Sequence, residues 1–247
     1  MKESATPDSS VERINNGWRL GIERGDATRY RDAQLDDYSR LPRYKFPHRS
    51  HDPSTSLRMS LRARASNDSI PGTWGFGLWN DPFGLSLGFG GNPFRLPMLP
   101  NAVWFFHASP HNYLSFRDDK PAQGFLAQSF RSPVFHPLLI LAGLALPFSR
   151  KATRKLLGKV IDEDGIKLGV DVTQWHRYQL EWSQNRVTFW VDNIQAFESS
   201  VSPNPPLGVI IWIDNQYAAF TPEGKLSAGV LSNEESWIKI ENLVIRK

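Results

Sequence analysis

The sequence predicts an all-β fold, a two-sheet sandwich or jelly roll that carries one short helical insertion. Its apolar segments are mostly short and alternate with period two, which is typical of strands with one buried face. They recur at intervals of roughly 8–12 residues, and 18 Pro and 18 Gly separate them. This spacing favours a sandwich over a parallel α/β sheet, and 247 residues suit one large domain of that class.

The first half of the chain opens with a polar stretch and continues with strands. Residues 1–12 contain Ser, Pro and Asp, so we expect a flexible tail before a single domain at residues 13–247. Leu57–Ala65 alternates apolar residues with Arg and Ser and is expected to form a half-buried strand. In Trp74–Trp79 aromatic residues alternate with glycine, which inside a strand often marks the close approach of a ligand or another backbone. Two further short strands are expected at Val103–Phe106 and Tyr113–Phe116.

The second half shows the strand pattern more clearly. Trp175–Trp182 and Val187–Asp192 flank the polar segment Ser183–Arg186, which predicts a β-hairpin with a four-residue loop. Leu207–Asp214 alternates strictly, so its residues divide between two faces of a strand. One face carries Leu207, Val209, Ile211 and Ile213, and the other carries Gly208, Ile210, Trp212 and Asp214. A last strand is expected at Trp237–Ile245.

The segment at residues 137–160 departs from the strand pattern and is expected to be the helical insertion. Leu138–Leu146 is apolar on every side, Pro147 interrupts the helix, and the second half carries five Lys and Arg without an acid. We expect a helical hairpin packed on the sandwich with a solvated basic face. A lid over the open face of a sheet and an interfacial membrane anchor are the alternatives.

Composition excludes several classes of function. The chain has no Cys, which rules out disulfides, thiolate metal sites and a cysteine nucleophile. Leu138–Leu146 is about half of the roughly 20 residues that span a bilayer, so no transmembrane helix is expected. The N-terminus has no apolar signal-peptide region, which predicts a cytoplasmic location. A net charge of +4 on mostly dispersed cations gives no support for nucleic-acid binding.

Two segments resemble glycoside hydrolase family 16 and its concanavalin A-like relatives. The first is Leu57–Ala65 followed by Pro71–Trp79, with its Pro-Gly-Thr-Trp sequence, and the second runs from Trp175 to Asp192. The resemblance implies a concanavalin A-like jelly roll whose concave sheet face holds a glycan. Gln34–Tyr38 and Asn80–Phe83 also resemble a bacterial branch of family-16-like proteins.

The catalytic pattern of that family is missing. Family 16 enzymes carry Glu-x-Asp-x-(x)-Glu on a strand soon after the Trp segment, because retaining hydrolysis uses two neighbouring carboxylates. Here the corresponding strand is Asn101–His107, and no carboxylate occurs between Asp81 and Asp118. Hydrolysis by the family mechanism is therefore not expected, and the chain belongs, on this resemblance, to a branch without it.

Other side chains could still form a site on the concave face. Trp79, Trp104 and Trp212 are candidate platforms for stacking on a sugar, although tryptophan in a sandwich is more often a core residue. For proton transfer the candidates are Asp214, Asp81 and His107, of which Asp81 also fits a turn before Pro82. Polar ligand-binding candidates are Gln34, Asp36, Asn80, Asn215, Gln216 and Tyr217, with His111 and Tyr38 as further members. No cofactor is expected, the two histidine pairs 48/51 and 107/111 give little support for a metal, and Asp162–Gly165 is interpreted as a turn rather than a calcium site.

Three functions remain open from the sequence. The leading one is carbohydrate binding, or carbohydrate cleavage by a non-standard pair of acids. The second is binding or conversion of an apolar small molecule in an aromatic pocket that Leu138–Leu146 covers, and the third is a protein-interaction module. The second is suggested by six phenylalanines, Phe76, Phe83, Phe89, Phe94, Phe105 and Phe106. The glycine-rich segment 84–91 is expected to be a loop at the mouth of the site.

Overall fold

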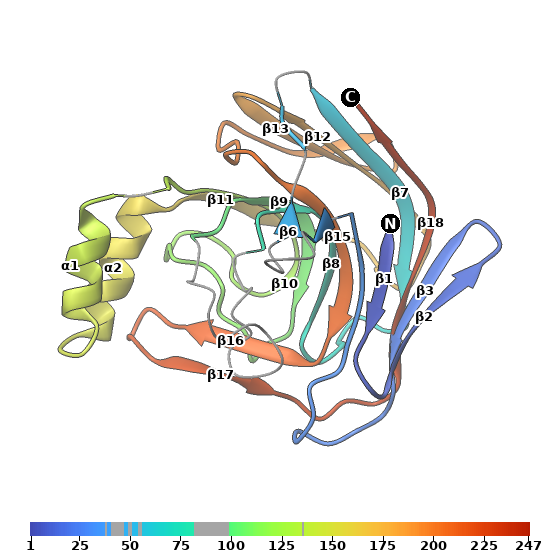
Figure 1. Ribbon diagram of the computed structural model, residues 1–247, viewed down its shortest axis with the longest axis horizontal. Coiled ribbons are helices and arrows are strands. Elements are labelled where there is room, and N and C mark those ends of the chain that lie inside the picture. The colour runs from blue at the N-terminus through green and yellow to red at the C-terminus, as the bar shows by residue number, and fades with distance from the viewer. Residues whose placement is uncertain (38, 41–46, 49–50, 54–55, 82–98, 135) are drawn as a thin grey trace.

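Two antiparallel sheets of seven strands each form the body of the protein (Figure 1), which we describe from a computed structural model. The structure describes residues 1–37, 39–40, 47–48, 51–53, 56–81, 99–134 and 136–247. Sheet A has the order β1 (Lys2–Ala5), β4 (Asp32–Asp36), β15 (Gly208–Asp214), β8 (Thr73–Trp79), β9 (Ala102–Ala108), β10 (Gly124–Arg131) and β11 (Asp162–Lys167). Sheet B has the order β14 (Ile194–Ser199), β13 (Arg186–Val191), β12 (His176–Ser183), β7 (Leu57–Ala65), β18 (Ser236–Arg246), β3 (Gly17–Ile22) and β2 (Ser9–Ile14).

Two smaller ribbons and a pair of helices complete the described fold. The hairpin β16 (Gln216–Phe220) and β17 (Leu226–Val230) follows β15 directly, and β5 (Ser39–Arg40) pairs with β6 (Pro47–His48). The helices α1 (Leu138–Ala145) and α2 (Arg150–Val160) lie between β10 and β11. Figure 1 shows them projecting together from one side of the sandwich, near the tip of the β16–β17 hairpin. The predicted all-β sandwich with one helical insertion is confirmed.

The main core fills the space between the sheets. The alternation expected in Leu57–Ala65 is observed, because its apolar side chains are buried while Arg58 and Arg62 are exposed. From sheet A, the face of β15 that carries Leu207, Val209, Ile211 and Ile213 joins the same core. Period-two patterning therefore assigned the inward face of these strands correctly.

Sheet A also carries a second apolar cluster on its outer face. This outer cluster contains Ala102, Trp104, Phe106, Ala108, Leu126, Phe130, Ile161, Ile210 and Trp212. Consequently β9 and β15 are buried along their whole length, on both faces. The members of this cluster are the residues that alternate with the main core along each strand, so they lie on the face of sheet A that points away from sheet B.

The helical insertion is confirmed with the break where proline predicted it. Ser149 caps α2, its side-chain oxygen accepting a hydrogen bond from the Ala152 N–H at 3.2 Å. The two helices are joined by a hydrogen bond of 3.2 Å from the Thr153 hydroxyl to the Ala142 carbonyl. No helix among the described residues is long and apolar enough to cross a membrane.

Four local expectations were wrong. Residues 1–12 are not a loose tail, because β1 pairs with β4 in sheet A and β2 with β3 in sheet B. The hairpin loop has two residues instead of four, since Ser183 pairs with Arg186. Tyr113–Phe116 forms only a single bridge, from Tyr113 to Ala219. Asp162–Gly165 lies in the edge strand β11 rather than in a turn, and its buried Glu163 is satisfied by side-chain and backbone donors.

Candidate functional site

A row of carboxyl and amide side chains lies on the outer face of sheet A, across β4 and β15. In the antiparallel register Asp32 is opposite Asp214, Gln34 is opposite Trp212, and Asp36 is opposite Ile210. Directly opposite residues in such a pair have Cβ atoms about 4.5–5.5 Å apart. The fold therefore places Asp32 and Asp214 side by side, although they are far apart in the sequence.

Asp214 is held by the neighbouring strand and by the start of β16. Its Oδ1 accepts hydrogen bonds from the Thr73 N–H (3.1 Å), the Thr73 hydroxyl (2.9 Å) and the Gln216 N–H (3.1 Å). The Thr73 hydroxyl in turn accepts from the Trp212 indole N–H at 2.9 Å. Burial raises the pKa of the Asp214 carboxyl to about 7, while the hydrogen bonds from Thr73 and Gln216 oppose that rise.

Asp32 is more strongly perturbed than its neighbour. Burial raises the pKa of its carboxyl well above the usual range, and the nearby carboxylates of Asp214 and Asp36 add to the rise. A side-chain hydrogen bond with Tyr30 partly opposes it. Its backbone N–H donates to the Thr6 hydroxyl at 2.8 Å, which ties the strand to the chain between β1 and β2. Two adjacent carboxyls with raised pKa values mark a candidate for acid–base chemistry.

An aromatic stack runs along the same face away from the carboxyl pair, with Trp212 two residues from Asp214 and Trp79 at the far end of β8. Trp79 and Trp212 are stacked with ring centroids 5.9 Å apart and planes 6° apart, and Trp104 lies 5.7 Å from Trp212. Trp104 and Trp212 are 4% and 6% exposed, whereas Trp79 is half-buried. The expectation that all three tryptophans can stack on a ligand is corrected, because Trp104 and Trp212 are buried in the outer cluster. Both rings pack against Trp79.

The two glycines of β8 make room for these rings. A Cβ at Gly75 would lie 2.9 Å from the Trp212 ring, and a Cβ at Gly77 would lie 2.6 Å from the Cα and Cβ of Trp104. The aromatic–glycine alternation in Trp74–Trp79 thus reflects side chains and backbone of the same sheet approaching closely. A ligand is not needed to explain it.

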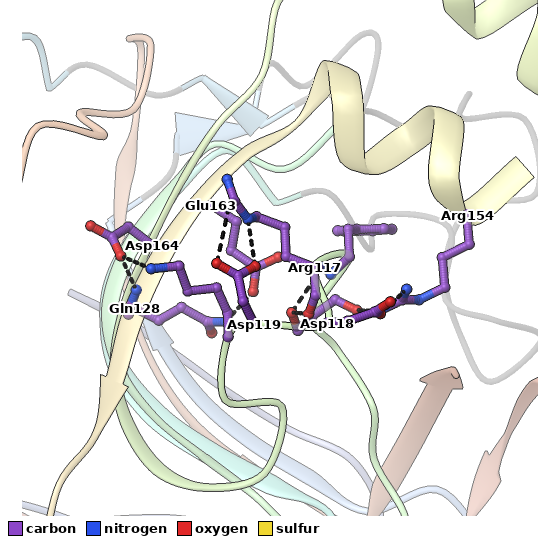
Figure 2. A network of polar contacts seen from close by, with 11 residues as sticks. Arg117, Asp118, Asp119, Gln128, Arg154, Glu163 and Asp164 are labelled. Carbon is purple, nitrogen blue, oxygen red and sulfur yellow. Dashed lines mark hydrogen bonds and ion pairs between the residues drawn. The ribbon is translucent and has the colours of Figure 1, made fainter. Parts of the chain in front are cut away.

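The far side of the aromatic cluster is covered by α2 and the segment after β9. Leu157 of α2 and the loop residues Leu114 and Phe116 pack against it. Gln128 links the cluster to the edge strand, because its Oε1 accepts from the Trp104 indole at 3.4 Å and its Nε2 donates to Glu163 at 3.0 Å. Figure 2 shows Gln128 and Glu163 within a polar network that reaches Arg154 of α2.

Arg154 joins α2 to the loop after β9 and to the β16–β17 hairpin. Its guanidinium donates to the carbonyls of Phe220 (2.8 Å) and Ser115 (3.1 Å) and forms an ion pair with Asp118 at 2.5 Å. The side chain is only 5% exposed. Since a buried guanidinium is costly to leave without acceptors, these hydrogen bonds fix α2 to both the loop and the β16–β17 hairpin.

Two of the predicted ligand-binding residues, Asn80 and Asn215, use their side-chain amides in hydrogen bonds to the backbone of the protein. Asn80 donates to the Leu99 carbonyl and accepts from the Asn101 N–H, so its amide joins β8 to the start of β9. Asn215 is fully buried and bonds the backbone of Arg29, Arg31 and Leu231. Their amides are used within the fold, which corrects the ligand-binding assignment of both.

Asp81 and His107 do not join Asp214. Asp81 follows β8 in a left-handed conformation (φ 55°), at the strand end opposite Thr73. Six residue steps of about 3.3 Å separate the two ends, roughly 20 Å. His107 points toward the main core, where it stacks on Trp74 with centroids 5.4 Å apart. Burial lowers the pKa of His107 to about 4, so it is neutral there. The grouping of these three residues in one site was wrong.

Other predicted residues do lie near the carboxyl pair. Gln34 and Asp36 share its face, and the Gln34 amide donates to Asp36 at 2.9 Å. Gln216 bonds Asp214 through its backbone, and its side-chain Nε2 is buried without a hydrogen-bond partner among the described residues. Tyr217 lies one residue further along β16, with its ring 6.1 Å from that of His111. Tyr38, Phe83, Phe89, Phe94 and the segment 84–91 lie outside the described residues.

Sequence reasoning missed Asp32, Tyr30 and Thr73. Asp32 was detectable, because it shares the alternation of Gln34 and Asp36 on one strand. Its partnership with Asp214 was not, since it depends on which strands pair. In the part of the chain that the structure describes, no group of three or more His, Asp and Glu side chains is arranged to hold a metal ion.

Comparison with known proteins finds similarity of structure but no match of sequence. No protein-family model matches the chain, and no curated protein matches it. A glycoside hydrolase family 16 endo-glucanase from Bacteroides ovatus is 11% identical over 97% of this chain and 85% of that chain, with a TM-score of 0.48. The catalytic domain of an endo-1,3-beta-glucanase (laminarinase) from Thermotoga petrophila RKU-1 is 10% identical over 98% and 81%, with a TM-score of 0.45. A sialidase is 6% identical over 99% of this chain, which spans 16% of the sialidase, with a TM-score of 0.43.

At these identities and TM-scores the similarity carries no argument about substrate or reaction. The two-sheet antiparallel sandwich that the family 16 resemblance implied is instead evident from the strand order of the chain itself.

Proposed function

We propose that this chain acts on a carbohydrate that lies over β4 and the end of β8, the partly exposed parts of the outer face of sheet A, and that Asp32 and Asp214 transfer the proton. The observation that carries the proposal is the cross-strand carboxyl pair with raised pKa values, on the same face as the stacked tryptophans. The sequence segments that resemble family 16 support a carbohydrate as the ligand.

The surroundings of the pair suit a sugar ring. Trp79 is half-buried and its ring is stacked on that of Trp212, so the two tryptophans form one aromatic surface of the kind that stacks on sugars. Gln34 and Asp32 are also partly exposed and can accept or donate hydrogen bonds to hydroxyl groups. An apolar surface with a few polar side chains at its border is the usual composition of a ligand site.

The two carboxyls differ in a way that assigns their roles. Burial and two neighbouring carboxylates raise the pKa of Asp32, which favours its protonated form and assigns it the role of proton donor in this proposal. Asp214 accepts three hydrogen bonds that favour its ionised form, so it is the carboxylate. Directly opposite residues, with Cβ atoms about 4.5–5.5 Å apart, allow the two carboxyls to approach within the roughly 5–5.5 Å that a retaining pair uses.

The test is hydrolysis of a polysaccharide panel, including β-1,3/1,4-glucans, by the wild type and by Asp32→Asn and Asp214→Asn. We expect turnover of at least one polysaccharide, lost by at least about 100-fold in either variant. The wild-type rate should rise on the acid side with a midpoint near pH 7, where Asp214 ionises. Asp162→Asn, on an exposed residue that is ion-paired with Arg131, is the matched control and should retain full activity.

A thermal-shift measurement on the same proteins separates binding from catalysis. A ligand at 100 times its dissociation constant adds about 2.7 kcal/mol to the free energy of unfolding. Stabilisation by a glycan without turnover would limit the proposal to binding. Stabilisation only by apolar compounds would contradict it and favour the rival aromatic-pocket function, for which the tightly stacked outer cluster would have to open.

A further inference from the structure

Helix α1 is apolar on all sides and yet exposed. Of its eight residues only Ala142 is buried, while Ile140, Leu141 and Leu144 are 58%, 52% and 64% exposed. Leu146 and Phe148 continue the patch, the latter with 90% of its surface exposed. A helix that is apolar all round is normally buried in protein or in lipid. This surface is therefore expected to have a partner.

Cations surround the patch on the second helix. Arg150, Lys151, Lys155 and Lys159 of α2 are exposed, and none of them forms an ion pair with the residues that the structure describes. The segment 137–160 contains no acid. Carboxylates of neighbouring elements include Asp118, which is paired with Arg154, Asp162, which is paired with Arg131, and Glu223, whose pKa is lowered by the Thr221 hydroxyl and further by Lys151.

The hairpin presents these two surfaces as one rigid unit. Thr153 bonds α1 to α2, and Arg154 fixes α2 to the body of the protein. Figure 1 shows both helices projecting beyond the sandwich, so they can meet a flat surface before the sheets do. The positive charge of α2 favours a partner with an anionic surface, and the exposed apolar side chains of α1 favour a partner that also offers an apolar layer.

We propose that the α1–α2 hairpin holds the protein on an anionic lipid surface. In this arrangement Ile140, Leu141 and Leu144 enter the boundary between headgroups and acyl chains, and the cations of α2 contact the anionic headgroups. A short apolar helix with a cationic flank binds in this way without spanning the bilayer. The membrane would position the enzyme or binding protein without taking part in the carboxyl site.

The experiment is flotation of the purified full chain with vesicles of phosphatidylcholine, with and without about 30 mol % phosphatidylserine. We expect binding to the anionic vesicles and its reduction at high salt, because salt screens headgroup charge. Leu141→Glu combined with Leu144→Glu should lower the partition coefficient at least about tenfold. Lys151→Ala and Lys155→Ala should each lower it about fivefold.

Ile194→Glu is the matched control, because Ile194 is 73% exposed but belongs to β14 at the edge of sheet B. It should bind vesicles as the wild type does, and circular dichroism should show all variants folded. Failure of the wild type to float with anionic vesicles, or equal loss in Ile194→Glu, would overturn the proposal. A dimer in gel filtration that Leu141→Glu and Leu144→Glu convert to a monomer, without vesicle binding, would assign the patch to a second copy of the chain instead.

Discussion

The two outer faces of the sandwich differ sharply in what covers them. On sheet B the outer face is solvated, with Arg58 paired to Glu181 at 2.7 Å and Lys239 lying 4.9 Å from the Trp237 ring centroid. On sheet A the outer face is buried, so that β9 and β15 have no exposed residue. An antiparallel sheet needs only one buried face to be stable. The second buried face of sheet A therefore needs a separate cover, which α2 and the loop after β9 supply in part.

The chemistry of the two faces follows from that difference. Ion pairs on sheet B remain in water and contribute little to the free energy of unfolding. Carboxyls on sheet A lose water, and their pKa values rise. A substitution on the outer face of sheet A should therefore change the free energy of unfolding, or its pH dependence, more than a substitution on the outer face of sheet B. Three sets of variants test this difference.

The largest difference is expected between tryptophans on the two faces. Trp104→Ala removes a ring that is 4% exposed and in contact with several aromatic neighbours, so it should lower the free energy of unfolding by about 3–5 kcal/mol. Trp237→Ala, on the solvated face, should cost about 1 kcal/mol or less. Urea unfolding followed by circular dichroism measures both. Equal costs would show that the outer cluster of sheet A is not a packed core.

The next effect is the pH dependence of Asp214→Asn. The pKa of Asp214 is about 7 in the folded protein and 3.8 in the reference state, so folding binds a proton and stability from this group is lost as pH rises from 3.8 to about 7. The variant keeps an acceptor for Thr73 but cannot ionise. It should match the wild type near pH 4 and exceed it at pH 8 by at most about 4 kcal/mol.

His107 on the inner face titrates with the opposite sign. Burial lowers its pKa from 6.5 to about 4, so stability from this group is lost as pH falls through that range. The wild-type curve is therefore a sum of opposing slopes, and His107→Phe should reveal the slope of the carboxyls alone. If the difference between Asp214→Asn and the wild type does not change with pH, the pKa of Asp214 is not raised on folding, and the expected midpoint of the reaction near pH 7 is wrong.

The smallest effect is expected for the ion pair of Arg58 and Glu181 on sheet B. A double-mutant cycle with both residues changed to Ala should give a coupling energy of about 0.2–1 kcal/mol that declines with salt. The side chains are 54% and 25% exposed, so solvent screens them. A coupling energy of several kcal/mol would remove the contrast between the two outer faces.

Much of this fold could be predicted from local patterns. Leu57–Ala65 revealed its buried face by strict alternation, and Pro147 revealed the break between α1 and α2. The same alternation placed Trp212 and Asp214 on the face of β15 opposite the main core. The N-terminal strand β1 was missed, because residues 2–5 are polar and are held by backbone pairing with β4, which leaves no hydrophobic pattern.

The sequence by itself determined many of the core strands, the buried faces of β7 and β15 and the helical insertion, because these depend on near neighbours in the chain. Only the tertiary structure decided which carboxyl stands beside Asp214 and that His107 faces the core. Strand order and register set such partnerships, and they join residues that are distant in the chain. A carboxyl acquires its proton affinity from those neighbours and from burial, so the site could not be derived before the sheet was assembled.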